Sequence, residues 1–499
     1  MKKFPALTRT IESIKQNNRQ DAPWLKLFFT NDRSPAHRSV AEMQRRAAWI
    51  GLAIILLSLN ELTYIVASSY IPYVGSLLPL ALIIASFYAM WRAIRPASPQ
   101  EQDRIAQHNA KNTPTRWQRT VLLLILLLTL GGAVELGHGV AMSILAPQFS
   151  NDGTSLDTNA AILLLQGRNP YTDSNLVDLS RRFPIQPDWT TPLRQGQFQN
   201  RLDYPSMAEL QSVLDTSIKA GSVPEFESKV SYPALSFLTL VPFALVGNYN
   251  VLPFYIISYL LIIYIAWKAV HPALRPWVIV LSLANIPMWS SAVGGNLDVF
   301  YILLLIPAWL LRERRWTSAA LFGLALASKQ PAWFFIPFYA IMAYRHYGLK
   351  DTCYRLAMAG GLALAINLPF ILWDPQAWLA GVLAPVKDPM FPMGVGIVNL
   401  SVSHLLPYLP TMVYTILEAI AMLAMLVLYW RISRKHPEAA MFLAVIPLLL
   451  AWRSLPSYFY CTAFPLFILI TARPRPSLMP SFATLRLRAR ATPPLTARI

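Results

Sequence analysis

Apolar runs alternate with short basic segments from residue 47 to residue 472, and this alternation sets the expected fold. Several of the runs are shorter than the roughly 20 residues that a straight membrane span needs. We nevertheless expect an all-α polytopic membrane protein with about 12 transmembrane helices. The predicted spans are 47–68, 71–91, 119–146, 251–267, 276–293, 298–311, 316–328, 331–344, 353–372, 411–430, 438–452 and 456–472.

Composition supports the same class of protein. Of 499 residues, 55% are hydrophobic and only 14% are charged, and the mean hydropathy is +0.40. A soluble domain carries roughly 25% charged residues, so soluble enzymes, disordered chains and fibrous proteins are excluded. The two cysteines, Cys353 and Cys461, have no spacing typical of a disulfide framework or a zinc site.

The net charge of +18 indicates how the spans are oriented. Lys and Arg favour cytoplasmic loops. In this chain they concentrate in every second segment between the predicted spans, and these segments all lie on the same side of the membrane. We therefore expect both termini in the cytoplasm of a cell-membrane protein, with a basic tail at 473–499 near anionic lipid head groups rather than nucleic acid. The first 45 residues lack a signal-peptide core, so insertion is expected to use an internal span.

One long polar insertion, residues 148–230, is expected to form an ordered extracytoplasmic cap. Its segments 157–166 and 206–220 have the pattern of short helices. The apolar run 233–247 follows it and is predicted to lie at the outer interface or to dip part-way into the membrane. The alternative is a crossing paired with a miscounted span elsewhere.

Polar residues from distant parts of the sequence fall on the predicted outer face. They are Asp152 and Asp157, Asp298, Lys329 with Gln330, and Arg453. Cations suit a lipid phosphate, and a carboxylate can take a proton from an attacking hydroxyl. Other roles stay open, because Asp157 suits a helix N-cap and Lys329 can snorkel from a span end. No compact carboxylate cluster demands a metal.

Four segments, in this order, resemble the GT-C glycosyltransferases and look closest to the polyprenyl-phosphate-mannose-dependent type, glycosyltransferase family 87. They are SNDGTSLDTNAAILLLQGRNPYT, SYPALSFLTLVPFALVG, GGNLDVFYILLLIPAWLLRERR and LFGLALASKQPAWFFIPF. The resemblance covers roughly residues 118–472 and includes the outer loop within 148–250. It leaves 1–46 as a cytoplasmic segment and 47–117 as an additional hairpin with a basic linker.

The resemblance implies an inverting transfer of sugar from a polyprenyl-phosphate carrier, with an Asp of the first outer loop as base. The spacing before GRNPY points to Asp157, and Asp152 is the alternative. Lys329 matches the Lys of the pattern GLALASK, and with Arg453 it is expected to bind the donor phosphate. Further site candidates are Asp298, Asn296, Gln330, Tyr171, Tyr232 and His404.

The expected function is therefore transfer of mannose, another hexose or a pentose to an extracytoplasmic glycan, glycolipid or protein. The expected partners are the lipid-linked donor, this acceptor and membrane lipid, with no nucleic acid. No cofactor is expected, and metal dependence is left open. The alternatives are a transporter or flippase, which typically shows internal repeats, and a polysaccharide polymerase or ligase that uses lipid-linked sugars.

Overall fold

The computed structural model describes residues 28, 35–70, 72–98, 100, 115–149, 151–182 and 186–473. Most of the N-terminal segment 1–46, the linker around 101–114 and nearly all of the tail 473–499 therefore lie outside the described residues, together with the predictions made for them. The described chain is mostly helical, in agreement with the expected class.

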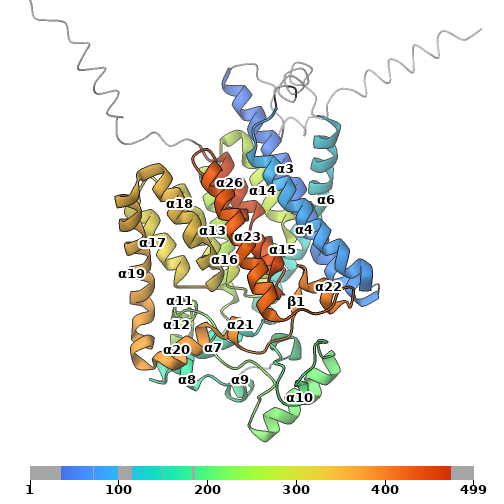
Figure 1. The fold of residues 1–499 in the computed structure, drawn as a ribbon, viewed down its shortest axis with the longest axis vertical. Coiled ribbons are helices and arrows are strands. Elements are labelled where there is room, and N and C mark those ends of the chain that lie inside the picture. The colour runs from blue at the N-terminus through green and yellow to red at the C-terminus, as the bar shows by residue number, and fades with distance from the viewer. Residues whose placement is uncertain are drawn as a thin grey trace, which may run out of the picture.

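Three long helices form the first part of the bundle (Figure 1). They are α3 (Pro35–Tyr70), α4 (Pro72–Ile94) and α6 (Arg116–Leu145). α3 and α4 pack along each other as an antiparallel hairpin, and α3 also contacts α6. A capping box between Thr115 and Gln118 starts α6, since each satisfies a backbone or side-chain group of the other. α3 begins twelve residues before the predicted span at 47–68.

The predicted outer loop folds into a layer of short helices at one end of the bundle (Figure 1). These are α7 (Asp152–Leu165), α8 (Pro170–Asp173), α9 (Leu176–Arg182), η1 (Pro187–Trp189), η2 (Gly196–Phe198) and α10 (Met207–Ala220). The run 233–247 forms two helices of four and five residues, α11 (Leu235–Leu238) and α12 (Val241–Leu245). Neither is long enough to cross a membrane.

The second part of the bundle contains α13 (Leu252–Ala269), η3 (Pro272–Leu274), α14 (Arg275–Ala284), α15 (Ile286–Val293), α16 (Asp298–Leu310), α17 (Arg315–Leu326), η4 (Gln330–Phe335), α18 (Ile336–Tyr347) and α19 (Leu349–Trp373). α14 and α15 meet at a bend of 61° that begins after Ala284 and involves Pro287. Proline cannot continue the helical hydrogen bonding of the preceding turn, so it favours such a break.

The C-terminal part returns to the loop layer before it re-enters the bundle. It contains α20 (Pro375–Val382), α21 (Ala384–Lys387), β1 (Met393–Gly394), α22 (Val398–Val402), α23 (Thr411–Ile432), η5 (Pro437–Ala439), α24 (Ala440–Leu443), η6 (Ile446–Leu450), β2 (Arg453–Ser454), α25 (Ser457–Tyr460) and α26 (Ala463–Thr471). β1 and β2 form a two-stranded parallel sheet, with Met393 opposite Arg453.

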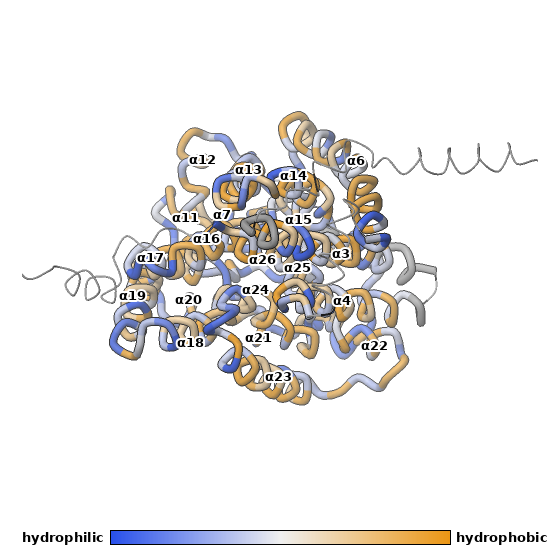
Figure 2. The backbone as a smooth tube through the Cα atoms, turned by 90° about the horizontal axis from the view of Figure 1, so that it is seen from above, coloured by the Kyte–Doolittle hydropathy of each residue, from blue (hydrophilic) through white to orange (hydrophobic). Residues whose placement is uncertain are grey.

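Six described helices are long and apolar enough to cross a membrane, or seven if the bent pair α14–α15 is one span. They are α3, α4, α6, α13, α19 and α23. Helices lie at the other predicted positions, but they are shorter: α16 has 13 residues and α17 has 12. The count of twelve spans is therefore not confirmed, whereas an integral membrane protein is supported. The helices α6 and α23, which lie at the edge of the bundle, are mainly hydrophobic (Figure 2).

The first and the last described helices, α3 and α26, have their terminal ends on the side of the bundle opposite the loop layer (Figure 1). α3 begins there, and α26 ends there beside α13, where Val270 and Ala472 form a β-bridge. A core of buried apolar side chains from α3, α4, α13–α18 and α26 holds this part together. A separate apolar core inside the loop layer joins α7, α9 and α10 to the start of α13. The polar residues singled out from the sequence lie where these two parts meet.

Candidate active site

A buried ion pair lies at the centre of the candidate site. Lys329 Nζ lies 2.9 Å from Asp298 Oδ1 and donates a hydrogen bond to Asn296 Oδ1 at 3.1 Å. The Asp298 side chain is fully buried and that of Lys329 is 7% exposed. Lys329 therefore does not snorkel to water, which removes that alternative for its position.

The turn before α16 positions Asp298 and Asn296. Asn296 Oδ1 accepts a hydrogen bond from the backbone N–H of Asp298 at 3.0 Å, a local Asx interaction that starts the helix. Gly295 has a φ of +83° and lies against Thr154 of α7, whose hydroxyl donates to the Gly295 carbonyl. A side chain at this position would be strained and would meet Thr154. The turn at Gly294 and Gly295 therefore places the Lys329–Asp298 ion pair beside α7.

α7 contributes the two carboxylates predicted from the sequence. Its N-cap is Asn151, so Asp157 lies in the second turn and does not cap the helix as the alternative proposed. Asp157 is 1% exposed, its Oδ1 accepts from the Ser236 hydroxyl at 2.9 Å, and its Oδ2 has no hydrogen-bond partner among the described residues. Burial raises the pKa of Asp157 to about 8, although Ser236 and the charge of Lys329 act in the opposite direction.

Asp152 lies in the first turn of α7 and is only partly buried. Burial raises its pKa, while a hydrogen bond from Thr191 and the positive charge of Arg453 lower it. Asp152 also accepts a hydrogen bond from the backbone N–H of Gly153 at 2.9 Å. The two carboxylates therefore differ in environment: Asp152 faces Arg453, and Asp157 faces Lys329.

Tyr232 lies between these groups. Lys329 Nζ is 5.1 Å from the centre of its ring, and the ring also lies against Gly153, where a Cβ would be 2.7 Å from it. Burial raises the pKa of Tyr232, and the nearby carboxylates of Asp152, Asp298 and Asp157 add to this shift. The phenol therefore stays protonated and is available as a neutral hydrogen-bond group.

Two further candidates hold the backbone beside Tyr232. The Tyr171 hydroxyl donates to the Tyr232 carbonyl at 2.8 Å. The Gln330 amide donates to the carbonyls of Ser231 and Val382, the latter at 2.9 Å. Both residues are therefore placed to position Tyr232 rather than to face the carboxylates directly.

Arg453 reaches the site from β2. Its guanidinium donates to the sulfur of Met390 and, at 3.8 Å, to that of Met393. Its Nε is buried without a hydrogen-bond partner among the described residues. No ion pair within 4 Å joins this guanidinium to a carboxylate of the described chain, so its charge is less neutralised than that of Lys329.

His404 lies away from this cluster. Its side chain is 77% exposed, and its Nε2 is 3.2 Å from Asp203 Oδ1. It lines a separate hollow of about 300 Å³ with Leu202 and Tyr408. The structure therefore brings the other nine candidates together and leaves His404 apart.

Some residues of the site were not found from the sequence. Ser236 binds Asp157, Thr191 binds Asp152, and Tyr255 has a buried hydroxyl without a hydrogen-bond partner in the described chain. The only available signal was Ser236, one of two hydroxyl residues inside the apolar run PALSFLTL. Among the described residues, no three His, Cys, Asp or Glu side chains are grouped as metal ligands.

The fold and this cluster define a helical membrane protein with a charged, buried site beneath an ordered loop layer. Residues 231–457 match the family model of glycosyltransferase family 87, which confirms the resemblance and is consistent with a membrane glycosyltransferase of the GT-C type. The match includes Tyr232, Asp298, Lys329 and Arg453 and begins after the α7 carboxylates. No curated protein and no solved structure matches the chain. The family indicates a glycosyltransferase and so favours an enzyme over the transporter alternative.

Proposed function

We propose that this protein transfers a sugar from a polyprenyl-phosphate carrier to an extracytoplasmic glycan, lipid or protein hydroxyl, with inversion at the anomeric carbon. The observation that carries the proposal is the convergence of two α7 carboxylates with Lys329 and Arg453, within a chain that matches a glycosyltransferase family. This convergence supplies a base and phosphate-binding cations in one place.

In the proposed step, an acceptor hydroxyl oxygen forms a bond to the anomeric carbon from the face opposite the carrier phosphate. The bond between this carbon and the phosphate oxygen breaks, and its electron pair leaves with the polyprenyl phosphate. The hydroxyl proton passes to a carboxylate of the enzyme. No nucleotide is consumed, because the phosphate ester already supplies the leaving group.

We assign the base role to Asp152 rather than Asp157. A base must meet a hydroxyl that arrives from water, and Asp152 is partly exposed whereas Asp157 is 1% exposed. With a pKa of about 8, Asp157 is mostly protonated at neutral pH and cannot readily accept another proton. Its neutral carboxyl instead packs beside the Lys329–Asp298 pair without adding charge.

Arg453 and Lys329 are proposed to stabilise the departing phosphate. The leaving group gains negative charge as the bond breaks, so cations held in a buried site stabilise the transition state more than the ground state. Arg453 is the stronger candidate, since Lys329 already pairs with Asp298 at 2.9 Å. A planar guanidinium also suits bidentate phosphate binding.

An apolar hollow supports a lipid-linked donor. It has a volume of about 390 Å³ and lies between α6, α13 and α15, with Gly137, Ile256 and Val293 among its lining residues. Val293 is two residues before Gly295, whose turn leads to Asn296 and Asp298. The hollow therefore adjoins the helix that leads to the charged cluster, and we propose that it binds part of the prenyl chain.

The test is transfer by purified protein from a set of radiolabelled polyprenyl-phosphate sugars, including mannose, glucose and arabinose, to membrane extracts and synthetic alkyl glycosides. We expect one donor to give a covalent product whose new glycosidic bond has the opposite anomeric configuration. Asp152→Asn is the negative control. Retained configuration, or transfer only from a nucleotide sugar, would contradict the proposal. Long glycan chains as products would instead favour the polymerase or ligase alternative.

A further inference from the structure

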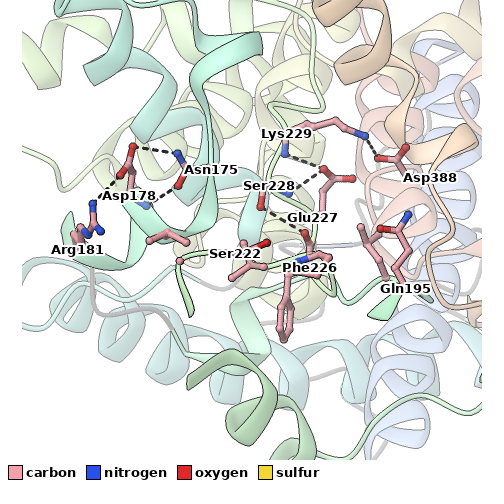
Figure 3. Close-up of a pocket in the computed structure, with 15 residues that line it drawn as sticks. Asn175, Asp178, Arg181, Gln195, Ser222, Phe226, Glu227, Ser228, Lys229 and Asp388 are labelled. Atoms are coloured by element: carbon pink, nitrogen blue, oxygen red, sulfur yellow. Dashed lines mark hydrogen bonds and ion pairs between the residues drawn. The ribbon is translucent and has the colours of Figure 1, made fainter. Parts of the chain in front are cut away.

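The loop layer contains a second polar hollow, separate from the charged cluster (Figure 3). Its volume is about 640 Å³, within the range typical of small-molecule sites. Its walls come from α9, the loop after α10, the segment 226–229, and Asp388 beyond α21. Nothing in the mechanism above uses this space.

The charged side chains of the hollow are paired. Lys229 Nζ donates to Asp388 Oδ2 at 2.6 Å, and Arg181 Nη1 donates to Asp178 Oδ1 at 3.3 Å (Figure 3). Burial raises the pKa of Glu227, and a hydrogen bond with Asp388 adds to this shift. The two cations of the lining, Lys229 and Arg181, are each paired with a carboxylate, so the lining as a whole has little net charge.

Its polar groups are held in place before any ligand arrives. The Glu227 carboxyl accepts hydrogen bonds from the backbone N–H groups of Ser228 and Lys229 at 3.0 and 2.8 Å. Asn175 and Asp178 bind each other through backbone and side chain at 2.8 and 3.1 Å. Fixed donors and acceptors lose little conformational entropy on binding, which favours a hydrogen-bonding ligand.

Two exposed lining residues, Gln195 and Ser222, add an amide and a hydroxyl that project from loops. Val177, Leu193 and Pro224 supply apolar surface between the polar groups. A neutral molecule with many hydroxyls and apolar C–H faces suits such a lining. A phosphate or a nucleotide does not, because no unpaired cation faces it from among these lining residues.

The hollow is connected to the reactive cluster through its walls. Glu227 N donates to the Thr191 carbonyl at 2.9 Å, and the Thr191 side chain hydrogen-bonds the Asp152 carboxylate. On another wall, Asp388 is two residues from Met390, whose sulfur contacts Arg453. Thr191 therefore links a lining residue of the hollow to the proposed base.

We propose that this hollow binds a neutral sugar unit of the acceptor, so that the acceptor of this enzyme is an oligosaccharide or a glycan-bearing molecule. The identification of this sugar as part of the acceptor rests on the proposed function, whereas the binding of a neutral sugar in the hollow does not depend on it. The bound unit is not the one that reacts. It holds the chain while a neighbouring unit presents its hydroxyl to Asp152.

The test is a bulky substitution at the rim, Ser222→Trp, which fills the hollow from an exposed loop. The matched control is Ser212→Trp, because Ser212 is exposed on α10 and does not line the hollow. Binding is measured by saturation-transfer NMR with mannotriose, maltotriose and galactotriose on the full-length protein in detergent. Activity is measured as transfer to the trisaccharide that binds and as hydrolysis of the donor by water.

We expect the wild type and Ser212→Trp to bind at least one trisaccharide. Ser222→Trp should lose this binding and show a rise of tenfold or more in the acceptor KM, while donor hydrolysis and the unfolding temperature stay unchanged. The proposal is overturned if the wild type binds none of the three, or if Ser222→Trp binds and transfers like the wild type. If binding depends on Ser222 but the wild type uses no polyprenyl-phosphate donor, the sugar site stands and the proposed function fails.

Discussion

Substitution of Lys329 by methionine separates the structural role of the central ion pair from its proposed catalytic role. At 2.9 Å and an effective dielectric constant of about 20, the attraction between Lys329 and Asp298 is about 6 kcal/mol. Desolvation of both groups offsets part of this attraction. Removal of one partner of a buried pair typically lowers the free energy of unfolding by about 3–5 kcal/mol, because the other charge stays buried and unpaired. We expect Lys329→Met to lose stability in this range.

A double variant then isolates the chemistry. In Lys329→Met with Asp298→Asn, the buried carboxylate is replaced by a neutral amide, so most of the lost stability should return. Transfer should stay lower by about 10²–10³, the usual effect of removing one group that stabilises developing negative charge. Asp298→Asn alone keeps the ammonium group, and we expect its rate to stay within about tenfold of the wild type.

Stability is measured by intrinsic-fluorescence thermal unfolding in detergent, and activity by transfer from the radiolabelled donor. Lys268→Met is the matched control, because Lys268 is exposed at the end of α13. The unfolding temperature and the transfer rate of this variant should match those of the wild type. The reasoning is refuted if the double variant transfers sugar at the wild-type rate. Lys329 would then serve only to neutralise Asp298.

Three other predictions concern α7 and α6. Asp152→Asn should lower transfer by about 10²–10⁴ with unchanged protein levels, whereas Asp157→Asn resembles the protonated wild-type carboxyl and should lose far less; equal losses would contradict the assignment of the base. Because the pKa of Asp157 is about 8 in the folded protein and 3.8 as the reference, the wild type binds the extra proton when folded and loses stability as pH rises between these values. The unfolding temperature of Asp157→Asn should therefore gain on that of the wild type with rising pH, and parallel curves would disprove this. Gly132→Ala should lower the free energy of unfolding by about 1–3 kcal/mol, because the new Cβ would be 2.1 Å from the Leu283 carbonyl oxygen. The control is Gly131→Ala, whose Cβ meets nothing within 4 Å, and it should be neutral in the same unfolding assay.

Local sequence patterns predicted the local structure well. The capping box of Ser206 and Glu209 starts α10 within the segment 206–220, where the sequence placed a helix. The predicted helical segment began at residue 157, five residues too late, because α7 begins at Asp152 and its N-cap is Asn151. Two cap-forming residues close together leave such a boundary ambiguous until packing selects one of them.

The number of spans was harder to predict from hydropathy. α16 and α17 lie at predicted spans but have only 13 and 12 residues, fewer than the roughly 20 of a straight span, so the count of twelve stays a prediction. Residue type and predicted side of the membrane selected ten candidates, and nine of them lie close together in the structure, while their roles stay predictions. These two criteria misplaced His404, because membership in an outer loop says nothing of distance to the cluster, and His404 pairs with Asp203 instead.

The charges of the cluster explain why the base and the phosphate site lie together in the proposed mechanism. With Asp157 neutral, the positive charges of Lys329 and Arg453 face the negative charges of Asp298 and Asp152, so the cluster itself is close to neutral. A bound carrier phosphate adds negative charge, which raises the proton affinity of Asp152 across Arg453. As the bond between the anomeric carbon and the phosphate oxygen breaks, the phosphate gains a second negative charge. The proton affinity of Asp152 therefore rises further. The base therefore becomes stronger at the moment when the acceptor hydroxyl becomes more acidic, and this coupling needs no ionisable group besides those of the cluster.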